Sequence, residues 1–195
     1  RGPGRPPAAK SAQTRGRILR AAREVFGEMG FDAATFQEIA ARADLTRPAI
    51  NNYFSSKAAL YDEVAGRVSD TVLDANHVAS AAPTLADQVL TFIRVGLRAQ
   101  DSDPSRAAFL VQAAMDVGHL PGGDCRASAL VERFVRNAVG SALRRGEVEG
   151  EAEGLSDMLM GLVWGAAVQI GRENGERADR MLEQLCGMLD QGLVR

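Results

Sequence analysis

The sequence predicts an all-α fold, and three observations support this prediction. Apolar residues recur at the three- and four-residue spacing of helices along most of the 195 residues. Clusters of proline and glycine, which end helices, separate these stretches. Runs of Val, Ile and Thr with the two-residue alternation of strands do not occur in the sequence. We therefore expect a chain of helices joined by short breaks.

Composition narrows the class of protein. The chain has 46% hydrophobic and 25% charged residues, a balance typical of soluble globular proteins. It contains no run of about 18 uncharged apolar residues, the length that a membrane span needs. Its two cysteines, Cys125 and Cys186, stand far apart without a CxxC partner, which fits a reducing compartment and offers no zinc site. These features predict a cytoplasmic protein.

Positive charge is concentrated at the N-terminal end. Residues 1–60 carry ten Lys and Arg against five Asp and Glu, a net charge of +5. The remaining residues carry thirteen against twenty, a net charge of −7, and the two parts add to the −2 of the whole chain. A basic end on an acidic protein suggests a polyanionic partner at that end, and a solvated tail is an equally good explanation of the charge alone.

Residues 1–13 are expected to form a flexible basic arm, because they are rich in Pro and Gly and poor in apolar groups. The arm contains Gly4-Arg5-Pro6-Pro7, which is similar to the core of AT-hooks. In that interpretation Arg5 enters an A·T-rich minor groove. The alternative is a disordered tail without a partner.

Two helices are predicted after the arm. From Thr14 the apolar pattern becomes helical, and Gly30 marks the end of the first helix. Thr35 suits the N-cap of a second, short helix, and Glu38 three residues later completes a capping box.

A tight turn and a third helix follow. Asp44 is a residue that tolerates the left-handed conformation of such a turn. Thr46 is a good N-cap, and Pro48 falls in the first turn, where its missing N–H costs nothing. The third helix is expected over residues 46–54, with Ile50 and Phe54 facing inward.

The rest of the chain is predicted to be helical. Ser55 or Ser56 caps a fourth helix, and the expected helices cover residues 56–80, 84–100, 104–118, 124–146, 151–173 and 177–194. We expect a small three-helix domain over residues 14–60 and a larger helical domain over residues 61–195.

Residues 35–54 have the spacing of a helix-turn-helix. Two short helices are joined by a tight turn, and the second begins with small or polar residues that can approach base edges. Asn pairs with adenine, Arg with guanine, and the Ala methyl contacts the methyl of thymine. The outward residues of the third helix are Arg47, Ala49, Asn51, Asn52 and Tyr53. The pattern predicts an N-terminal domain that reads DNA.

The same stretch resembles the TetR family of bacterial regulators, in spacing, caps and core positions over about fifty residues. Three positions depart from the family pattern: Asp44 stands where glycine is usual, Asn51 where tyrosine is frequent, and Pro48 where small residues are common. The matching residues are Ile18, Ala21, Ala22, Phe26, Gly30, Phe31, Thr35, Ile39, Ala40, Ala43, Leu45, Thr46, Ile50, Tyr53, Phe54, Lys57 and Leu60.

The resemblance implies roles for individual residues. Thr35, Tyr53 and Lys57 would contact phosphates, which set register and salt dependence. Arg47, Ala49, Asn51 and Asn52 would face the major groove and set sequence choice. Thr46 and Pro48, at the start of the reading helix, complete the predicted DNA-binding set.

The resemblance also implies that the C-terminal domain binds a small molecule and dimerises through its last two helices. A hydrophobic or amphipathic effector is expected, and plain core packing is the alternative for each residue. The effector candidates are Phe92, Phe109, Gln112, Met115, Phe134, Met160, Trp164 and Gln169. The homodimer candidates, which include a side of small residues, are Met158, Gly161, Leu162, Gly165, Met181, Leu185, Met188 and Leu189.

Catalysis finds little support. His77 and His119 lack metal-ligand spacing to acids or cysteines, and no phosphate-binding loop motif occurs. We expect no enzyme, cofactor or metal. The resemblance implies a ligand-responsive regulator, a repressor that binds a palindromic operator as a dimer and is released by a small-molecule effector. The alternative is an all-helical ligand-binding or scaffolding protein without specific DNA binding.

Overall fold

The computed structural model describes residues 7–97, 105–116 and 126–172, together with residues 180, 181, 183, 184 and 187. Every regular element in these ranges is helical, so the predicted all-α class is confirmed. The elements are α1 (Pro7–Ala33), α2 (Phe36–Arg42), α3 (Arg47–Asn51), α4 (Lys57–Ser80), α5 (Leu85–Phe92), the π-helical turn η1 (Ile93–Leu97), α6 (Ser105–Met115), α7 (Arg126–Arg145) and α8 (Ala152–Arg172).

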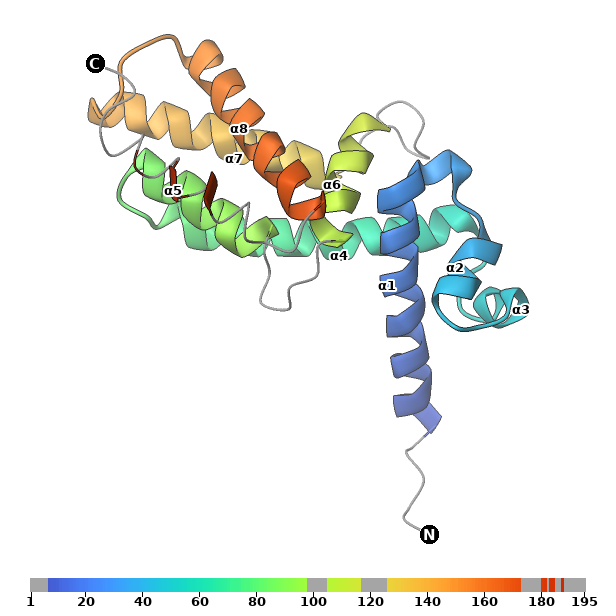
Figure 1. The fold of residues 1–195 in the computed structure, drawn as a ribbon. Helices are drawn as coiled ribbons and strands as arrows, with labels where there is room; N and C mark the ends of the chain where they lie inside the picture. Colours follow the sequence, from blue (N-terminus) through green and yellow to red (C-terminus); the bar gives the residue numbers. More distant parts are fainter. Residues whose placement is uncertain are drawn as a thin grey trace.

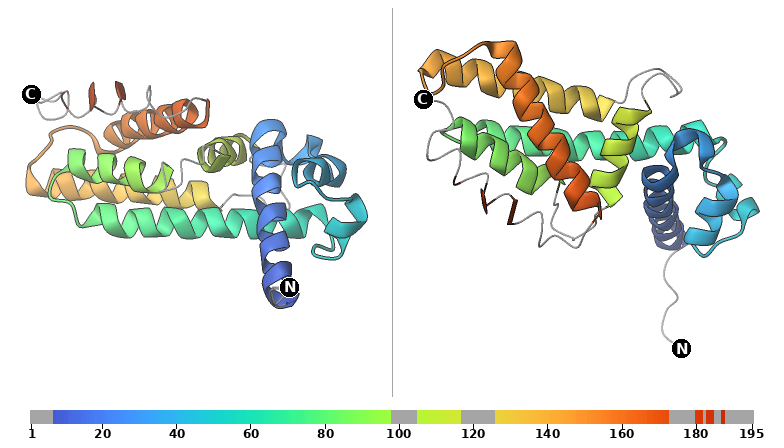
Figure 2. Two further views of the ribbon diagram at one scale, coloured as in Figure 1. Left: turned by 60° about the horizontal axis from the view of Figure 1, so that its bottom comes forward. Right: turned by 45° about the horizontal axis from the view of Figure 1, so that its top comes forward.

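The helices form a small N-terminal group and a larger body that share α4. Figure 1 shows α1 crossing α4, with α2 and α3 beyond the crossing, near the first turns of α4. At the other end of α4, α5 and α7 pack against it and α8 packs against α7. Between the two groups, α6 contacts both α1 and α8, and the two views of Figure 2 agree with this arrangement. The predicted boundary between residues 60 and 61 falls inside α4, so the two groups are joined by an unbroken helix.

The first helix is longer than predicted. It begins at Pro7, so residues 7–13 of the expected flexible arm are helical. Proline needs no hydrogen-bond partner in a first helical turn, and the two alanines that follow favour helix. The helix is kinked at Gly30, whose φ of 78° and ψ of 173° leave the helical region. Gly4, Arg5 and Pro6 of the AT-hook-like segment lie outside the described residues, and Pro7 begins α1.

Two groups of buried aromatic rings hold the core. Tyr61 of α4 lies between Phe26 of α1 and Phe109 of α6, with ring centroids 5.1 and 5.3 Å away. In the body, Phe92 of α5 and Phe134 of α7 stack at 4.2 Å. The first group joins the N-terminal helices to α6, and the second joins the helices of the body to one another.

The predicted helix over residues 84–100 is interrupted. Thr84 caps α5 as a helix start, but after Phe92 the chain widens into η1. In this turn Gly96 lies against α4, where an added Cβ would sit 2.9 Å from the Cβ of Ala75. A similar close approach joins α1 to α6, since a Cβ on Gly27 would lie 2.9 Å from the backbone nitrogen of Phe109.

The other body helices match their predicted ranges to within a few residues. Of the predicted helix over residues 177–194, the five described residues are helical. Across the described ranges, none of the helices combines the length and the apolar character needed to cross a bilayer.

Candidate nucleic-acid interface

The start of α2 is fixed by a reciprocal pair of hydrogen bonds. The backbone N–H of Glu38 donates to Oγ1 of Thr35 at 3.2 Å, and the backbone N–H of Thr35 donates to Oε2 of Glu38 at 3.0 Å. The predicted capping box is therefore confirmed. It satisfies N–H groups that the first turn of a helix leaves without intrahelical partners.

The turn and the start of α3 also follow the prediction. Asp44 adopts the left-handed conformation, with φ of 52°. Thr46 caps α3 by accepting a hydrogen bond from the backbone N–H of Ala49 at 3.4 Å, and Pro48 lies in the first turn.

The helix itself is shorter than the predicted range of residues 46–54, because it ends at Asn51. Its last turn tightens, since the N–H of Tyr53 bonds to the carbonyl of Ile50 at 2.8 Å. The chain then turns toward Ser56, the N-cap of α4.

Burial divides the residues of this segment into two faces. Ile50 and Phe54 are buried in the core, as predicted. The residues on the opposite side are open to solvent: Arg47, Pro48, Asn51 and Asn52 are exposed, and Ala49 and Tyr53 are partly exposed. Thr35 and Thr46 are exposed at their helix starts. Every candidate of the reading helix is therefore accessible to solvent. The reading helix belongs to the N-terminal group, at the end of α4 away from α5 (Figure 1).

Lys57 has a structural role that sequence reasoning did not identify. Its ammonium Nζ donates to the backbone carbonyls of Phe31, Asp32 and Ala34 at 2.6, 3.0 and 3.0 Å. It also lies 4.5 Å from the centre of the Phe31 ring. Lys57 therefore caps the C-terminal end of α1 from the first residue of α4. Its predicted phosphate contact stays a prediction.

Arg15 contacts the end of the reading helix, a role that the sequence pattern did not indicate. Its Nη1 donates to the backbone carbonyl of Tyr53 at 3.3 Å, and its Nε donates to Glu63 of α4 at 3.1 Å. A second nitrogen contacts the other oxygen of Glu63. The guanidinium lies 4.4 Å from the centre of the Phe54 ring. Arg15 thereby ties α1, the end of the reading segment and α4 together. These partners lie 38 and 48 residues away in the chain, so no local pattern indicates them.

Two further arginines fasten the helix-turn-helix to α1. Arg17 donates to the backbone carbonyls of the turn at Ala43 and Asp44, at 2.5 and 3.2 Å. Arg42 of α2 forms hydrogen bonds with Glu28 of α1 at 2.7 and 2.8 Å. The hydrogen bond from Arg42 lowers the pKa of Glu28, and the same bond raises the pKa of Arg42. The turn and the reading helix are therefore held as one unit with α1.

The effector candidates do not share one environment. Phe92, Phe109 and Phe134 are fully buried among other side chains, whereas Met115 is 74% exposed. Gln112 of α6 donates to Asp116, just beyond the end of that helix, at 2.8 Å. The half-buried candidates are Met160, Trp164 and Gln169 on α8.

The dimer candidates on α8 lie on an open side of that helix. Met158 is 47% exposed, and Gly161 and Gly165, three and seven residues further on, are exposed as well. Leu162 and Met181 are partly exposed. Leu185, Met188 and Leu189 lie outside the residues whose burial is described.

Comparison with known families identifies the same segment. A family model described as bacterial regulatory proteins of the tetR family matches residues 18–64. This match covers α2, α3, the turn between them and the flanking parts of α1 and α4.

Two characterised proteins share part of the sequence. The transcriptional activator FasR of Mycolicibacterium smegmatis is 34% identical over 104 residues, which is 53% of this chain and 40% of FasR. The transcriptional repressor BepR of Brucella suis is 42% identical over 59 residues, which is 30% of this chain and 28% of BepR. The matched stretches span less than half the length of either relative.

Solved structures share the fold over nearly the whole chain. The MbdR regulator of Azoarcus superposes with a TM-score of 0.74 at 22% identity, covering 93% of this chain and 100% of MbdR. The regulator FadR of Bacillus subtilis, solved in complex with stearoyl-CoA, gives a TM-score of 0.65 at 13% identity, covering 91% of this chain and 98% of FadR. At identities under 25%, this similarity shows a shared fold alone.

Proposed function

We propose that this chain, which belongs to the tetR family of bacterial regulatory proteins, represses transcription by binding a palindromic operator as a homodimer and is released by a small-molecule effector. The observation that carries the proposal is the reading helix. Its caps and three arginines fix it on α1, and its polar side chains are left open to solvent. Such a rigid, exposed helix suits the major groove of DNA. We place the protein in the cytoplasm.

Sequence choice is assigned to Asn51, Asn52 and Arg47. An asparagine amide bonds to both hydrogen-bonding atoms of the adenine edge, and arginine does the same for guanine. Arg47 and Asn51 on α3 and Asn52 at its C-cap are all exposed, and none is needed for the core. We place Thr35, Thr46 and Tyr53 against phosphates at the rim of this surface, where contacts set register.

Replacing Asn52 with alanine is expected to weaken binding to the operator by about tenfold to a hundredfold, because one bidentate base contact contributes about 1–3 kcal/mol of discrimination. Binding to unrelated duplexes should not change. Fluorescence anisotropy against the DNA upstream of the gene measures both affinities. The matched control is Asn137→Ala, an exposed asparagine on α7. Equal, weak binding of wild type and Asn52→Ala to all sequences would instead favour a ligand-binding or scaffolding protein without specific DNA binding.

A homodimer is proposed because one helix-turn-helix reads too few base pairs to be specific. The open side of α8 suits this role. A Cβ added at Gly161 or Gly165 meets no atom of the described residues within 4 Å, which supports the approach of another chain at these glycines. Methionine at position 158 adds exposed apolar surface next to them.

The Gly165→Glu variant is expected to shift the protein from dimer to monomer and to lower operator affinity at least about tenfold, because the carboxylate occupies the proposed contact. The described part of the chain leaves space for the side chain, so the melting temperature of the separated monomer should not fall. Analytical ultracentrifugation measures the oligomeric state. Gly66→Glu on α4 is the matched control, since a Cβ there is equally unobstructed. A variant that stays dimeric would remove this face from the interface.

The effector is proposed to be hydrophobic or amphipathic, and to act through α6. The half-buried candidates Met160, Trp164 and Gln169 belong to α8, and α6 packs on α8. The stearoyl-CoA bound by FadR, which shares the fold, supports an acyl thioester as the first compound to test.

Two hydrogen bonds connect α6 to α1. Nε of Arg23 donates to Oγ of Ser105 at 2.7 Å at the start of α6, and the backbone N–H of Phe31 donates to Asp116 at 3.0 Å just beyond its end. An effector that prefers one position of α6 would therefore shift α1 and the reading helix, provided that its affinity differs between the two states. Anisotropy with and without the acyl thioester measures release from the operator.

Repression rather than activation is the finer part of the proposal. BepR, a repressor, is 42% identical over its 59 matched residues, whereas FasR, an activator, is 34% identical over 104 residues. A promoter fusion compared with and without the gene decides the sign of regulation.

A further inference from the structure

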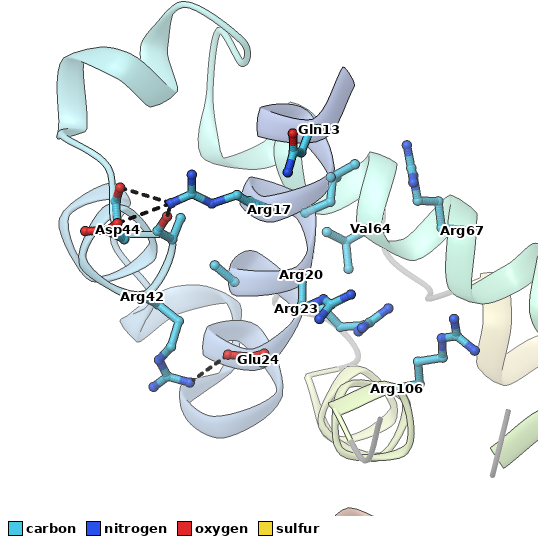
Figure 3. A pocket seen from close by; sticks show the side chains of 14 residues that line it. Gln13, Arg17, Arg20, Arg23, Glu24, Arg42, Asp44, Val64, Arg67 and Arg106 are labelled. Carbon is cyan, nitrogen blue, oxygen red and sulfur yellow. Dashed lines mark hydrogen bonds and ion pairs between the residues drawn. The ribbon is translucent and has the colours of Figure 1, made fainter. Parts of the chain in front are cut away.

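A groove of about 960 Å³ lies where α1, α4 and α6 meet, next to α2 (Figure 3). None of the residues assigned to effector or base recognition lines it. Six arginines and two acids do, which leaves an excess of four positive charges. These charged lining residues are Arg17, Arg20, Arg23, Arg42, Arg67 and Arg106, with Glu24 and Asp44.

Both acids are engaged on the side of the groove next to α2. Glu24 forms an ion pair with Arg42 at 3.3 Å, and Asp44 forms one with Arg17 at 3.5 Å. Figure 3 shows these two pairs on the same side, away from α6. The negative charges of the lining are therefore not directed at the arginines nearer α4 and α6.

Within the described ranges, Arg20, Arg67 and Arg106 on the α4 and α6 side are much less neutralised. Among the described residues, neither Arg20 nor Arg106 forms an ion pair. Arg67 pairs with Glu63 at 3.3 Å, but Glu63 also binds Arg15, so one carboxylate serves two guanidinium groups. Positive charge gathered without matching acids attracts anions to a concave surface.

These side chains come from three helices: Arg20 and Arg23 project from α1, Arg67 from α4 and Arg106 from α6. Figure 3 shows Arg20, Arg23 and Arg106 in the space between these helices, with Arg67 at the rim and pointing away from them. The hydrogen bond from Arg23 to Ser105 orients its guanidinium between α1 and α6. An arginine held in this way loses less conformational freedom when it binds a ligand.

We propose that this groove binds a small molecule that carries two or more phosphate groups. The planar guanidinium offers pairs of N–H donors that match phosphate oxygens, and several of them are needed to neutralise a polyphosphate. The volume lies in the range of small-molecule sites. The groove lies between the N-terminal group of helices and the body. The proposal depends on the groove alone and not on the proposed regulatory function.

Isothermal titration calorimetry at fixed ionic strength, with inorganic triphosphate and with ATP, tests the proposal on the full chain. Saturable binding of one molecule per chain is expected. Arg20→Gln and Arg106→Gln should each weaken it by about tenfold or more, the loss of one charge-assisted contact. The matched control, Arg136→Gln, removes an exposed arginine of α7 outside the groove and should leave binding unchanged. Equal affinity for the two compounds assigns recognition to phosphate alone, and tighter binding of ATP adds a contribution from the nucleoside.

Two results would overturn the proposal. The first is the absence of saturable binding of either compound, and the second is an equal loss in the Arg136→Gln control. If neither compound binds while Arg20→Gln and Arg106→Gln reduce the salt dependence of duplex binding, the arginines contact the DNA backbone instead. Specific DNA binding is measured separately, so a protein that binds triphosphate but reads no operator would refute the regulatory function and leave this site intact.

Discussion

The Phe134→Ala variant is expected to lose about 3–5 kcal/mol of the free energy of unfolding, the loss typical of removing a buried aromatic ring. Phe134 is fully buried on α7 and stacks on Phe92 of α5 at 4.2 Å. Truncation removes apolar contact and leaves a cavity between helices that cannot fully collapse. Urea unfolding followed by circular dichroism measures the loss.

The same experiment tests whether Phe134 lines an effector pocket. A side chain at the edge of an open pocket has few packing partners on that side, so its removal would cost less than about 1 kcal/mol. Met115→Ala is the control, because this effector candidate is 74% exposed and should change stability by less than about 0.5 kcal/mol. Phe134→Leu, which keeps most of the volume, should lie between wild type and Phe134→Ala. A small loss in both Phe134 variants would contradict the core assignment.

The Lys57→Met variant is expected to lower the free energy of unfolding by about 2–4 kcal/mol. Charge-assisted hydrogen bonds contribute about 1.5–3 kcal/mol each, and the partial exposure of the Lys57 ammonium reduces the sum of the three. Methionine keeps the apolar stem but leaves the carbonyls of Phe31, Asp32 and Ala34 without the ammonium. It also removes the contact of the charge with the Phe31 ring. Thermal unfolding measures this effect, and Lys10→Met, an exposed lysine of α1, is the control.

Salt dependence separates the capping role of Lys57 from the phosphate contact predicted for it. If the ammonium acts only within the chain, operator affinity falls because the end of α1 is disturbed, but the slope of log affinity against log salt stays the same. A phosphate contact predicts a slope reduced by about one unit. A variant as stable as wild type would show that the three carbonyl contacts contribute little.

The local features of the helix-turn-helix were predictable because they depend on residues close in sequence. Thr35, Thr46 and Ser56 act within three residues of themselves, and the left-handed conformation of Asp44 depends mainly on its own side chain. The burial of Ile50 follows from helical spacing in the same way.

The contacts that place this unit on the rest of the molecule could not be predicted. Arg15, Arg17 and Lys57 each bind backbone carbonyls 23 to 38 residues away, and a carbonyl carries no side-chain signature in the sequence. The groove is a similar case, since its arginines belong to three helices and become neighbours only in the fold. The early start of α1 was missed for another reason: Pro7 was interpreted as part of a flexible segment, although proline also begins helices.

Because α4 is one continuous helix, a tilt at its body end displaces its other end, as in a rigid lever arm. Its 24 residues span about 36 Å at 1.5 Å per residue, from the cap beside the reading segment to the packing against α5 and α7. A tilt of about 5° at the body end displaces the other end by about 3 Å, close to the separation of adjacent base pairs. If the chain reads an operator as proposed, a small repacking in the body is therefore enough to displace α3 by about one base-pair step along its half-site.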